Sequence, residues 1–105
     1  MTPEWISMEI REAQELMRLI YYQRDKARGV DRTLLRTMQE LAELSDAVLR
    51  HKGRSEVSGE MADVLAWLCS LANLLDIDLA TALRNKYNGV CSRCHKAPCE
   101  CAEEP

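Results

Sequence analysis

Four acidic residues, arranged as two pairs, are the part of this sequence with the clearest potential for chemistry. Glu40 and Glu43 form the first pair, and Glu60 and Asp63 form the second. Each pair is spaced i, i+3, which on a helix places both carboxylates on one face, one turn apart. Two such helices packed side by side would gather four carboxylates around one small volume. Oxygen ligands in that number suit Mg²⁺ or Mn²⁺, ions that usually act on phosphate-bearing substrates.

The segment that carries the second pair is apolar on two sides. Between residues 61 and 75 the chain is apolar nearly all round, and Trp67 shares a face with the second acidic pair. A helix that is apolar on both sides is buried, and a carboxylate at its edge must be paired, coordinated or protonated. No lysine or arginine lies between Arg54 and Arg84, so the segment cannot neutralise its own acids. A metal ion therefore explains these acids better than ion pairing, with a solvated acidic face as the alternative.

The elements that must position the acids are all predicted to be helices. No stretch shows sustained alternation with period two, so strands are not expected. Capping residues and glycines divide the chain into four helices, which run from a cap at Thr2-Pro3-Glu4 to about Arg28, from Asp31 to about Lys52, from Ser55 or Ser58 to about Asp76, and from a cap at Asp78 to about Asn88. The pattern predicts an all-α, four-helix bundle-type domain over residues 1–89, followed by a cysteine-rich tail over residues 90–105.

The composition describes one small domain without a dominant charge. The chain has 105 residues, with 14 basic and 17 acidic side chains and a net charge of −3. Without a basic field, nucleic-acid binding is not expected. Nothing resembles a signal peptide or a membrane span, so we expect a cytoplasmic protein without membrane association. The two-sided apolar character of the second and third helices predicts a homodimer or a higher homo-oligomer.

Four cysteines crowd the C-terminal tail. Cys91 and Cys94 form a Cys-x-x-Cys pair, and Cys99 and Cys101 form a Cys-x-Cys pair, with a histidine between the two. Such a set can complete a tetrahedral thiolate site for Zn²⁺, and a reducing cytoplasm favours zinc over disulfides. We therefore expect a structural zinc knuckle, with a metal-free tail as the alternative.

The acidic pairs lie within longer motifs that resemble a known family. The segments Gln39–Asp46 and Glu60–Leu65 are similar to the paired motifs of the MazG-like nucleoside triphosphate pyrophosphohydrolases, and the segment Leu71–Leu79 is similar to the family's continuation. This all-α superfamily includes dimeric dUTPases, dCTP pyrophosphatases and phosphoribosyl-ATP pyrophosphohydrolase. Its pattern is Glu-x-x-Glu followed, after a variable linker, by Glu-x-x-Asp. The resemblance covers roughly residues 20–88.

The resemblance implies a reaction and a set of site residues. Its members hydrolyse a nucleoside triphosphate between the α and β phosphates, which releases the monophosphate and pyrophosphate. The implied magnesium ligands are Glu40, Glu43, Glu60 and Asp63. Either Glu40 or Glu43 is the expected catalytic base that takes a proton from the attacking water.

The implied substrate contacts lie outside the acidic motifs. Lys86 matches a family lysine expected to contact phosphate, and helix one of the family supplies aromatic and basic groups around the base. The candidates for that role are Tyr21, Tyr22, Arg24, Asp25 and Arg32, and Trp67 is a candidate wall of the base pocket. For Tyr22 and Trp67 core packing is the alternative, and for Lys86 a solvated helix end.

A non-catalytic function is the competing hypothesis. The chain would then be a helical adaptor or regulator, and its zinc-knuckle tail would contact protein or nucleic acid. This hypothesis requires the acidic pairs to be solvated, and it makes Arg93 and Lys96 the contact residues.

Overall fold

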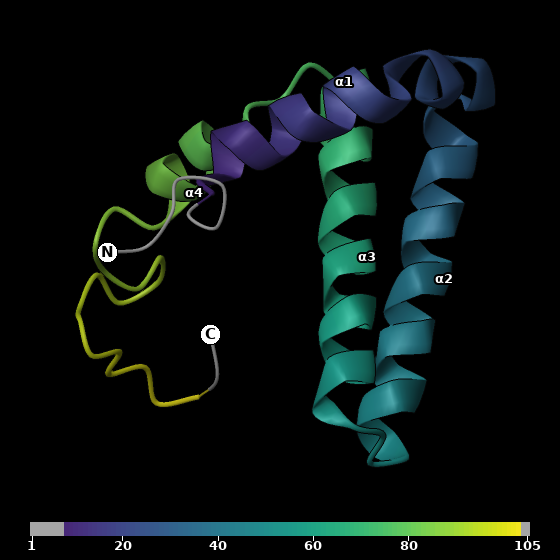
Figure 1. Cartoon of the computed structure of the whole chain (residues 1–105). Coiled ribbons are helices and arrows are strands. Elements are labelled where there is room, and N and C mark those ends of the chain that lie inside the picture. Colours follow the sequence, from purple (N-terminus) through teal and green to yellow (C-terminus); the bar gives the residue numbers. More distant parts are fainter. Residues whose placement is uncertain (1–7, 104–105) are drawn as a thin grey trace, which may run out of the picture.

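The computed structural model describes residues 8–103 and contains four α-helices, with no strand in that range (Figure 1). The helices are α1 (Ile10–Arg28), α2 (Val30–Leu49), α3 (Arg54–Leu74) and α4 (Leu79–Lys86). The antiparallel helices α2 and α3 lie side by side as a long hairpin, α1 crosses one end of this hairpin, and α4 packs against α1. The predicted all-α fold with four helices is confirmed.

A single glycine separates α1 from α2. Gly29 has a φ of 89°, a left-handed conformation that glycine adopts without steric cost. Its N–H donates to the Asp25 carbonyl at 2.9 Å and its carbonyl accepts from the Thr33 N–H at 3.1 Å, so it ends one helix and begins the next. The predicted end of the first helix at Arg28 is confirmed. Its predicted cap at Thr2-Pro3-Glu4 lies outside the described residues, but Met8 and Glu9 precede the helix, so α1 starts later than predicted.

The other helix boundaries differ from prediction by a few residues. Both α2 and α3 end in a Schellman motif, in which the left-handed residues are His51 and Asp76, each with a φ of 55°. The Lys52 N–H donates to the Ala47 carbonyl at 3.0 Å, which closes the end of α2 three residues before its predicted end. Because the left-handed residue is not glycine, the sequence carries no signal for either stop.

The helix starts also differ. Gly29 rather than Asp31 precedes α2, and Gly53 rather than a serine precedes α3. The predicted cap of α4 is confirmed, since the Asp78 carboxylate accepts from the Ala80 N–H at 3.2 Å. This helix ends at Lys86, two residues before the predicted Asn88.

The four helices are packed less compactly than is usual for a chain of this length. The radius of gyration is 16.1 Å, whereas a compact domain of this size has about 13 Å. Many large hydrophobic side chains on the hairpin are exposed: Leu34, Leu35, Met38, Leu41, Val48, Leu49, Met61, Leu65 and Leu68. Within residues 8–103 the buried hydrophobic residues are only Ala47, Cys69 and Ala72. The single chain therefore leaves an extensive apolar surface uncovered.

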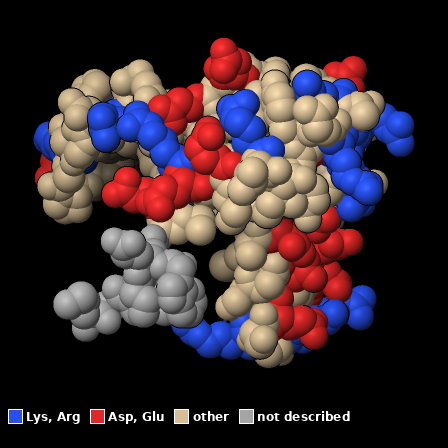
Figure 2. All heavy atoms as spheres, turned by 45° about the horizontal axis from the view of Figure 1, so that its top comes forward, with Lys and Arg blue, Asp and Glu red and all other residues tan. Residues whose placement is uncertain are grey.

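Charged side chains are unevenly distributed over this surface. Figure 2 shows a group of acidic side chains over the hairpin of α2 and α3, with basic side chains towards both of its ends. In the described part of the chain, no single helix is long and apolar enough to cross a membrane, although α3 and α4 pass that test together across a bend of 96°.

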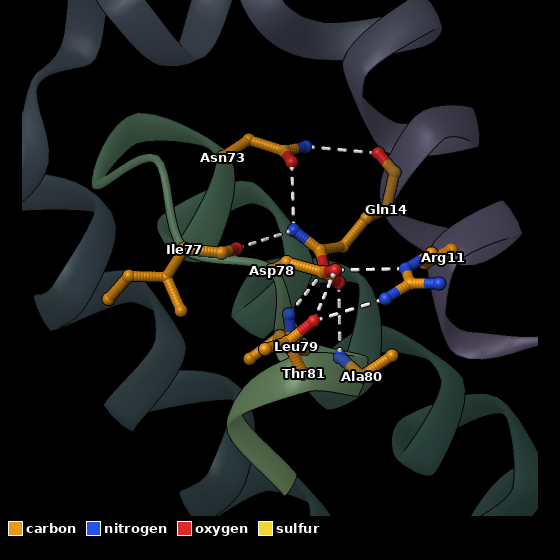
Figure 3. Close-up of polar contacts among 8 residues, drawn as sticks. All are labelled: Arg11, Gln14, Asn73, Ile77, Asp78, Leu79, Ala80 and Thr81. Atoms are coloured by element: carbon orange, nitrogen blue, oxygen red, sulfur yellow. Dashed lines mark hydrogen bonds and ion pairs between the residues drawn. The ribbon is translucent and has the colours of Figure 1, made fainter. Parts of the chain in front are cut away.

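A buried polar junction fixes where α1 crosses α3 (Figure 3). The side-chain amide of Gln14 donates to the Asn73 side chain at 3.1 Å and to the Ile77 carbonyl at 2.9 Å. Its side-chain oxygen accepts from the Leu79 N–H at 2.7 Å, and Asn73 donates back to the Gln14 carbonyl at 3.0 Å. These bonds tie α1 to the end of α3 and the start of α4.

An exposed ion pair extends the junction. The Arg11 guanidinium donates to the Asp78 carboxylate at 2.8 Å and to the Thr81 hydroxyl at 3.0 Å. The hydrogen bond from Thr81 and the ion pair with Arg11 lower the pKa of Asp78. The position of α1, and of every side chain that it presents to α3, is therefore set by polar contacts at one end of the helix.

Candidate metal centre

Three of the four predicted acidic ligands meet between α2 and α3. Glu40 on α2 and Glu60 and Asp63 on α3 each offer a carboxylate oxygen, and these oxygens all lie within 4.8 Å of one another. Glu40 is buried, with an exposed fraction of 7%, whereas Glu60 is half-buried and Asp63 is exposed. The side-by-side packing of the two helices thus produces the predicted cluster, with one solvent-facing side.

Two oxygens of the cluster are buried without a partner. Neither Oε2 of Glu40 nor Oε2 of Glu60 has a hydrogen-bond partner among the residues that the structure describes. The other oxygen of Glu40 accepts from the Arg36 guanidinium at 3.3 Å. A buried carboxylate oxygen without a donor is costly, and a cation coordinated by these oxygens would satisfy them.

The electrostatics of Glu40 agree with this interpretation. Burial raises the pKa of Glu40, the nearby carboxyl groups of Glu43 and Asp63 raise it further, and the Arg36 guanidinium lowers it by less. The carboxylate form is thus disfavoured in the cluster as it stands. A divalent cation reverses this balance, because it places positive charge where three acids converge.

Glu43 lies at the edge of the centre. It is exposed and close enough to affect the pKa of Glu40, but over residues 8–103 it is not part of the group whose oxygens lie within 4.8 Å. Its predicted role as a ligand therefore stays a prediction.

A pocket adjoins the acidic centre and shares Asp63 with it. This pocket lies between α1 and α3 and has a volume of about 160 Å³. Its lining consists of one stripe from each helix: Met17, Tyr21, Asp25 and Arg28 from α1, and Asp63, Ala66, Trp67 and Ser70 from α3. Small-molecule sites usually hold about 300 Å³ or more. The pocket thus accommodates one end of a nucleotide-sized ligand next to the acids.

Trp67, a predicted substrate contact, forms one wall of the pocket. Two guanidinium groups lie over its ring, that of Arg28 at 4.6 Å and that of Arg36 at 5.0 Å from the ring centroid. Because Arg36 also bonds to Glu40, the tryptophan and the acidic centre are connected through one side chain.

Tyr21 and Asp25 also line this pocket, whereas the other predicted substrate contacts do not. The ring of Tyr22 lies under Arg18 and Lys26, with cation–centroid distances of 5.1 and 4.8 Å. Arg24 is exposed on α1, and Lys86 is exposed on α4, which packs against α1. Their roles in substrate binding remain predictions.

Two residues of the pocket and the cluster were not predicted from the sequence. Arg28 lines the pocket beside Asp25, and Arg36 reaches both Trp67 and Glu40. A signal was present, because Met17, Tyr21, Asp25 and Arg28 follow the spacing of a single helical stripe. That stripe could be recognised only once α1 was known to cross α3.

The four tail cysteines form a second cluster. Cys91, Cys94, Cys99 and Cys101 each offer a sulfur, and these atoms all lie within 4.8 Å of one another. The Sγ–Sγ distance is 3.8 Å from Cys91 to Cys101 and 3.9 Å from Cys94 to Cys99. The tail follows α4 on the side of the molecule away from α2 (Figure 1), so this cluster is remote from the acidic centre.

Backbone donors converge on the sulfurs. The Arg93 N–H donates to Cys91 Sγ, the Glu100 N–H to Cys94 Sγ and the Cys101 N–H to Cys99 Sγ, each at 3.4 Å. Backbone N–H groups lower the pKa of Cys91 to about 6. The neighbouring cysteines, Cys99 foremost, raise the pKa of Cys101 to about 12. Four thiolates can coexist here only with a cation, which matches a tetrahedral sulfur site.

Comparison with known proteins identifies the class. The family model described as MazG nucleotide pyrophosphohydrolase domain matches residues 28–96, which include α2, α3, α4 and part of the cysteine segment. The chain belongs to this family, which confirms the resemblance found in the sequence and makes a hydrolase the expected class. A comparison with curated proteins finds no significant match.

Proposed function

We propose that this protein is a Mg²⁺-dependent nucleoside triphosphate pyrophosphohydrolase, with Mn²⁺ as a substitute ion. It cleaves the bond between the α and β phosphates to give a nucleoside monophosphate and pyrophosphate. The observation that carries the proposal is the cluster of Glu40, Glu60 and Asp63, with two buried oxygens that lack a partner among the described residues. Membership of the MazG family supports the reaction class.

The residues of the centre divide the work between them. Glu40, Glu60 and Asp63 would hold the ion, and their convergence sets its place beside the pocket. When bound, Mg²⁺ supplies positive charge for the phosphates and acidifies a water molecule. Either Glu43 or Glu40 accepts the proton of the attacking water, whose oxygen bonds to phosphorus as the bridging oxygen departs with pyrophosphate. Trp67 forms a wall for the rest of the nucleotide.

We also propose that the working unit is a homodimer or a larger homo-oligomer. The exposed apolar side chains of α2 and α3 and the open arrangement of the helices support this. A second copy of the hairpin would cover that surface and reduce its contact with water. One chain has a mass of 12.0 kDa, and light scattering of the purified protein should give at least twice that mass.

For the tail, we propose one structural Zn²⁺ bound by the four cysteines. The close approach of the sulfurs and the backbone donors directed at them support it. A closed thiolate site has no free position for a substrate, so it stabilises the tail and does no chemistry. Metal analysis after dialysis under reducing conditions should find about one zinc per chain.

The enzyme proposal is tested by pyrophosphate release from a panel of nucleoside triphosphates with Mg²⁺. Asp63→Asn should abolish release and leave the helical content unchanged. Glu56→Gln is the matched control, because Glu56 lies on the same helix, forms an exposed pair with Lys52 and is not one of the three clustered acids. No release from any nucleotide with folded wild-type protein would overturn the enzyme proposal and favour the adaptor hypothesis.

A further inference from the structure

Asp25 is a buried acid of the pocket that takes no part in the reaction as proposed above. It lies on α1 with an exposed fraction of 2% and lines the pocket together with Tyr21 and Trp67. A carboxylate in such surroundings requires partners, because desolvation of an unpaired charge is costly. Its contacts therefore indicate whether it has a structural role alone.

The structural contacts account for one of its two oxygens. Oδ1 of Asp25 accepts from the Arg28 guanidinium at 2.8 Å, and the same Arg28 nitrogen donates to the Thr33 hydroxyl at 3.3 Å. This chain of bonds connects the end of α1 to the start of α2 across Gly29. Oδ2 is buried and has no hydrogen-bond partner within residues 8–103. One acceptor is thus left over at the pocket.

The surroundings of this acceptor indicate what kind of group would satisfy it. Tyr21 and Trp67 supply aromatic surface, Met17 and Ala66 supply apolar surface, and the Arg28 guanidinium, which lies over the Trp67 ring, is bonded to Asp25. Such walls suit a flat ring rather than a phosphate. The phosphate-binding chemistry lies on the side of Asp63, in the acidic centre. A nucleotide whose phosphates reach the acids would therefore place its base towards Asp25.

We propose that Oδ2 of Asp25 accepts a hydrogen bond from the exocyclic amino group of the base, so that the pocket selects amino-bearing bases over their deaminated counterparts. The inference rests on the proposed function. A carbonyl oxygen at that position would face the carboxylate and leave both acceptors unpaired, which a water-poor pocket penalises strongly. An amino group supplies the missing donor, as it does when carboxylates contact cytosine.

Two matched substrate pairs test the inference. Within each pair, dCTP with dUTP and dATP with dITP, the exocyclic amino group becomes a carbonyl and the adjacent ring nitrogen gains a hydrogen. We expect the wild-type kcat/KM to favour the amino member of at least one pair about tenfold or more. Asp25→Asn keeps the shape and offers both a donor and an acceptor, so it should reduce that ratio to near one. Asp31→Asn, an exposed acid at the start of α2, is the control and should keep the wild-type ratio.

The outcomes of these assays distinguish the inference about Asp25 from the proposed function. Pyrophosphate release from all four nucleotides with equal efficiency would overturn the inference and leave the proposed function intact. An amino preference that persists in Asp25→Asn, or a shift only in the preference for deoxyribose over ribose, would also overturn it. If Asp25→Asn does not fold, the wild-type ratios still decide, because a preference for the carbonyl member in both pairs contradicts an acceptor at this place. No release from any nucleotide would refute the proposed function itself.

Discussion

Two buried polar clusters of this domain differ in how completely their groups are paired. At the junction of α1 and α3, the side chain of Gln14 uses both its donor and its acceptor capacity, and Asn73 does the same. In the acidic centre between α2 and α3, Glu40 and Glu60 each keep one buried oxygen without a partner among the described residues. Both clusters lie between packed helices, so burial alone does not distinguish them.

This difference shows which cluster has its polar groups paired within the chain itself. A fully paired network has no capacity left for a ligand, so it specifies structure by fixing the crossing of two helices. An under-satisfied network of like charges lowers stability unless something is added. The junction therefore positions the pocket, whereas the acidic centre keeps unpaired oxygens that are free to coordinate a cation. Variants of the two clusters and of the tail test this difference between the paired junction and the acidic centre.

The largest effect should come from a ligand of the acidic centre. Glu60→Gln removes one of three converging carboxylates, and we expect turnover to fall by at least about 100-fold, since even residues that only orient metal ligands contribute about 10–100-fold. The melting temperature should not fall, because a repulsive charge is removed. Pyrophosphate release and thermal unfolding measure the two. Near-normal turnover in this variant would contradict the proposed difference between the acidic centre and the junction.

The junction should show the opposite profile. Gln14→Ala removes the partner of the Leu79 N–H and of the Ile77 carbonyl and one of the two donors to the Asn73 oxygen, so we expect a loss of about 2–4 kcal/mol in unfolding free energy. For a chain of this size this lowers the melting temperature by roughly ten degrees or more. Gln23→Ala, at an exposed position of the same helix, is the control. An unchanged melting temperature in Gln14→Ala would show that the junction is not structural.

The stability of the metal-free protein should depend on pH through the acidic centre. Burial and the neighbouring acids raise the pKa of Glu40 above 4.5, so the folded state binds this proton more tightly than the unfolded state. Metal-free protein should therefore lose stability as pH rises from about 4.5 through the raised pKa. Glu40→Gln removes that loss and should raise the metal-free melting temperature at neutral pH. Melting curves from acidic to neutral pH, with a chelator, test this. An identical pH profile in wild type and variant contradicts it.

The smallest effect on turnover should come from the tail. Cys99→Ser removes one sulfur of the second cluster, so zinc content should fall well below one per chain. Because the tail lies away from the hairpin in Figure 1, turnover should stay within about twofold of wild type. Metal analysis and the pyrophosphate assay on the same preparation measure both. A large loss of turnover would mean that the tail takes part in the reaction.

Much of the fold could be predicted from the sequence, since helical periodicity and caps such as Gly29 and Asp78 are local signals. The ends at His51 and Asp76 could not, because a left-handed non-glycine residue depends on its hydrogen bonds and leaves no compositional trace. These stops are set by backbone geometry rather than by residue type.

The candidate site divides in a similar way. Glu40, Glu60 and Asp63 could be predicted from spacing, because the paired helices that bring them together are recognisable as two apolar-faced segments. The participation of Arg28 and Arg36 could not, since Arg28 reaches the pocket through the crossing of α1 over α3 and Arg36 contacts Trp67, which is far from it in the sequence. The Gln14 junction, which fixes that crossing, likewise has no local pattern.

Whether the acids form a metal centre can be measured by calorimetric titration of the metal-free protein with Mg²⁺. We expect saturable binding to wild type and to Glu56→Gln, and its loss in Glu40→Gln, because Glu40 contributes a buried unpartnered oxygen to the described cluster. Equal binding by wild type and Glu40→Gln, or no binding to folded wild-type protein, would contradict the claim that these acids form a metal centre.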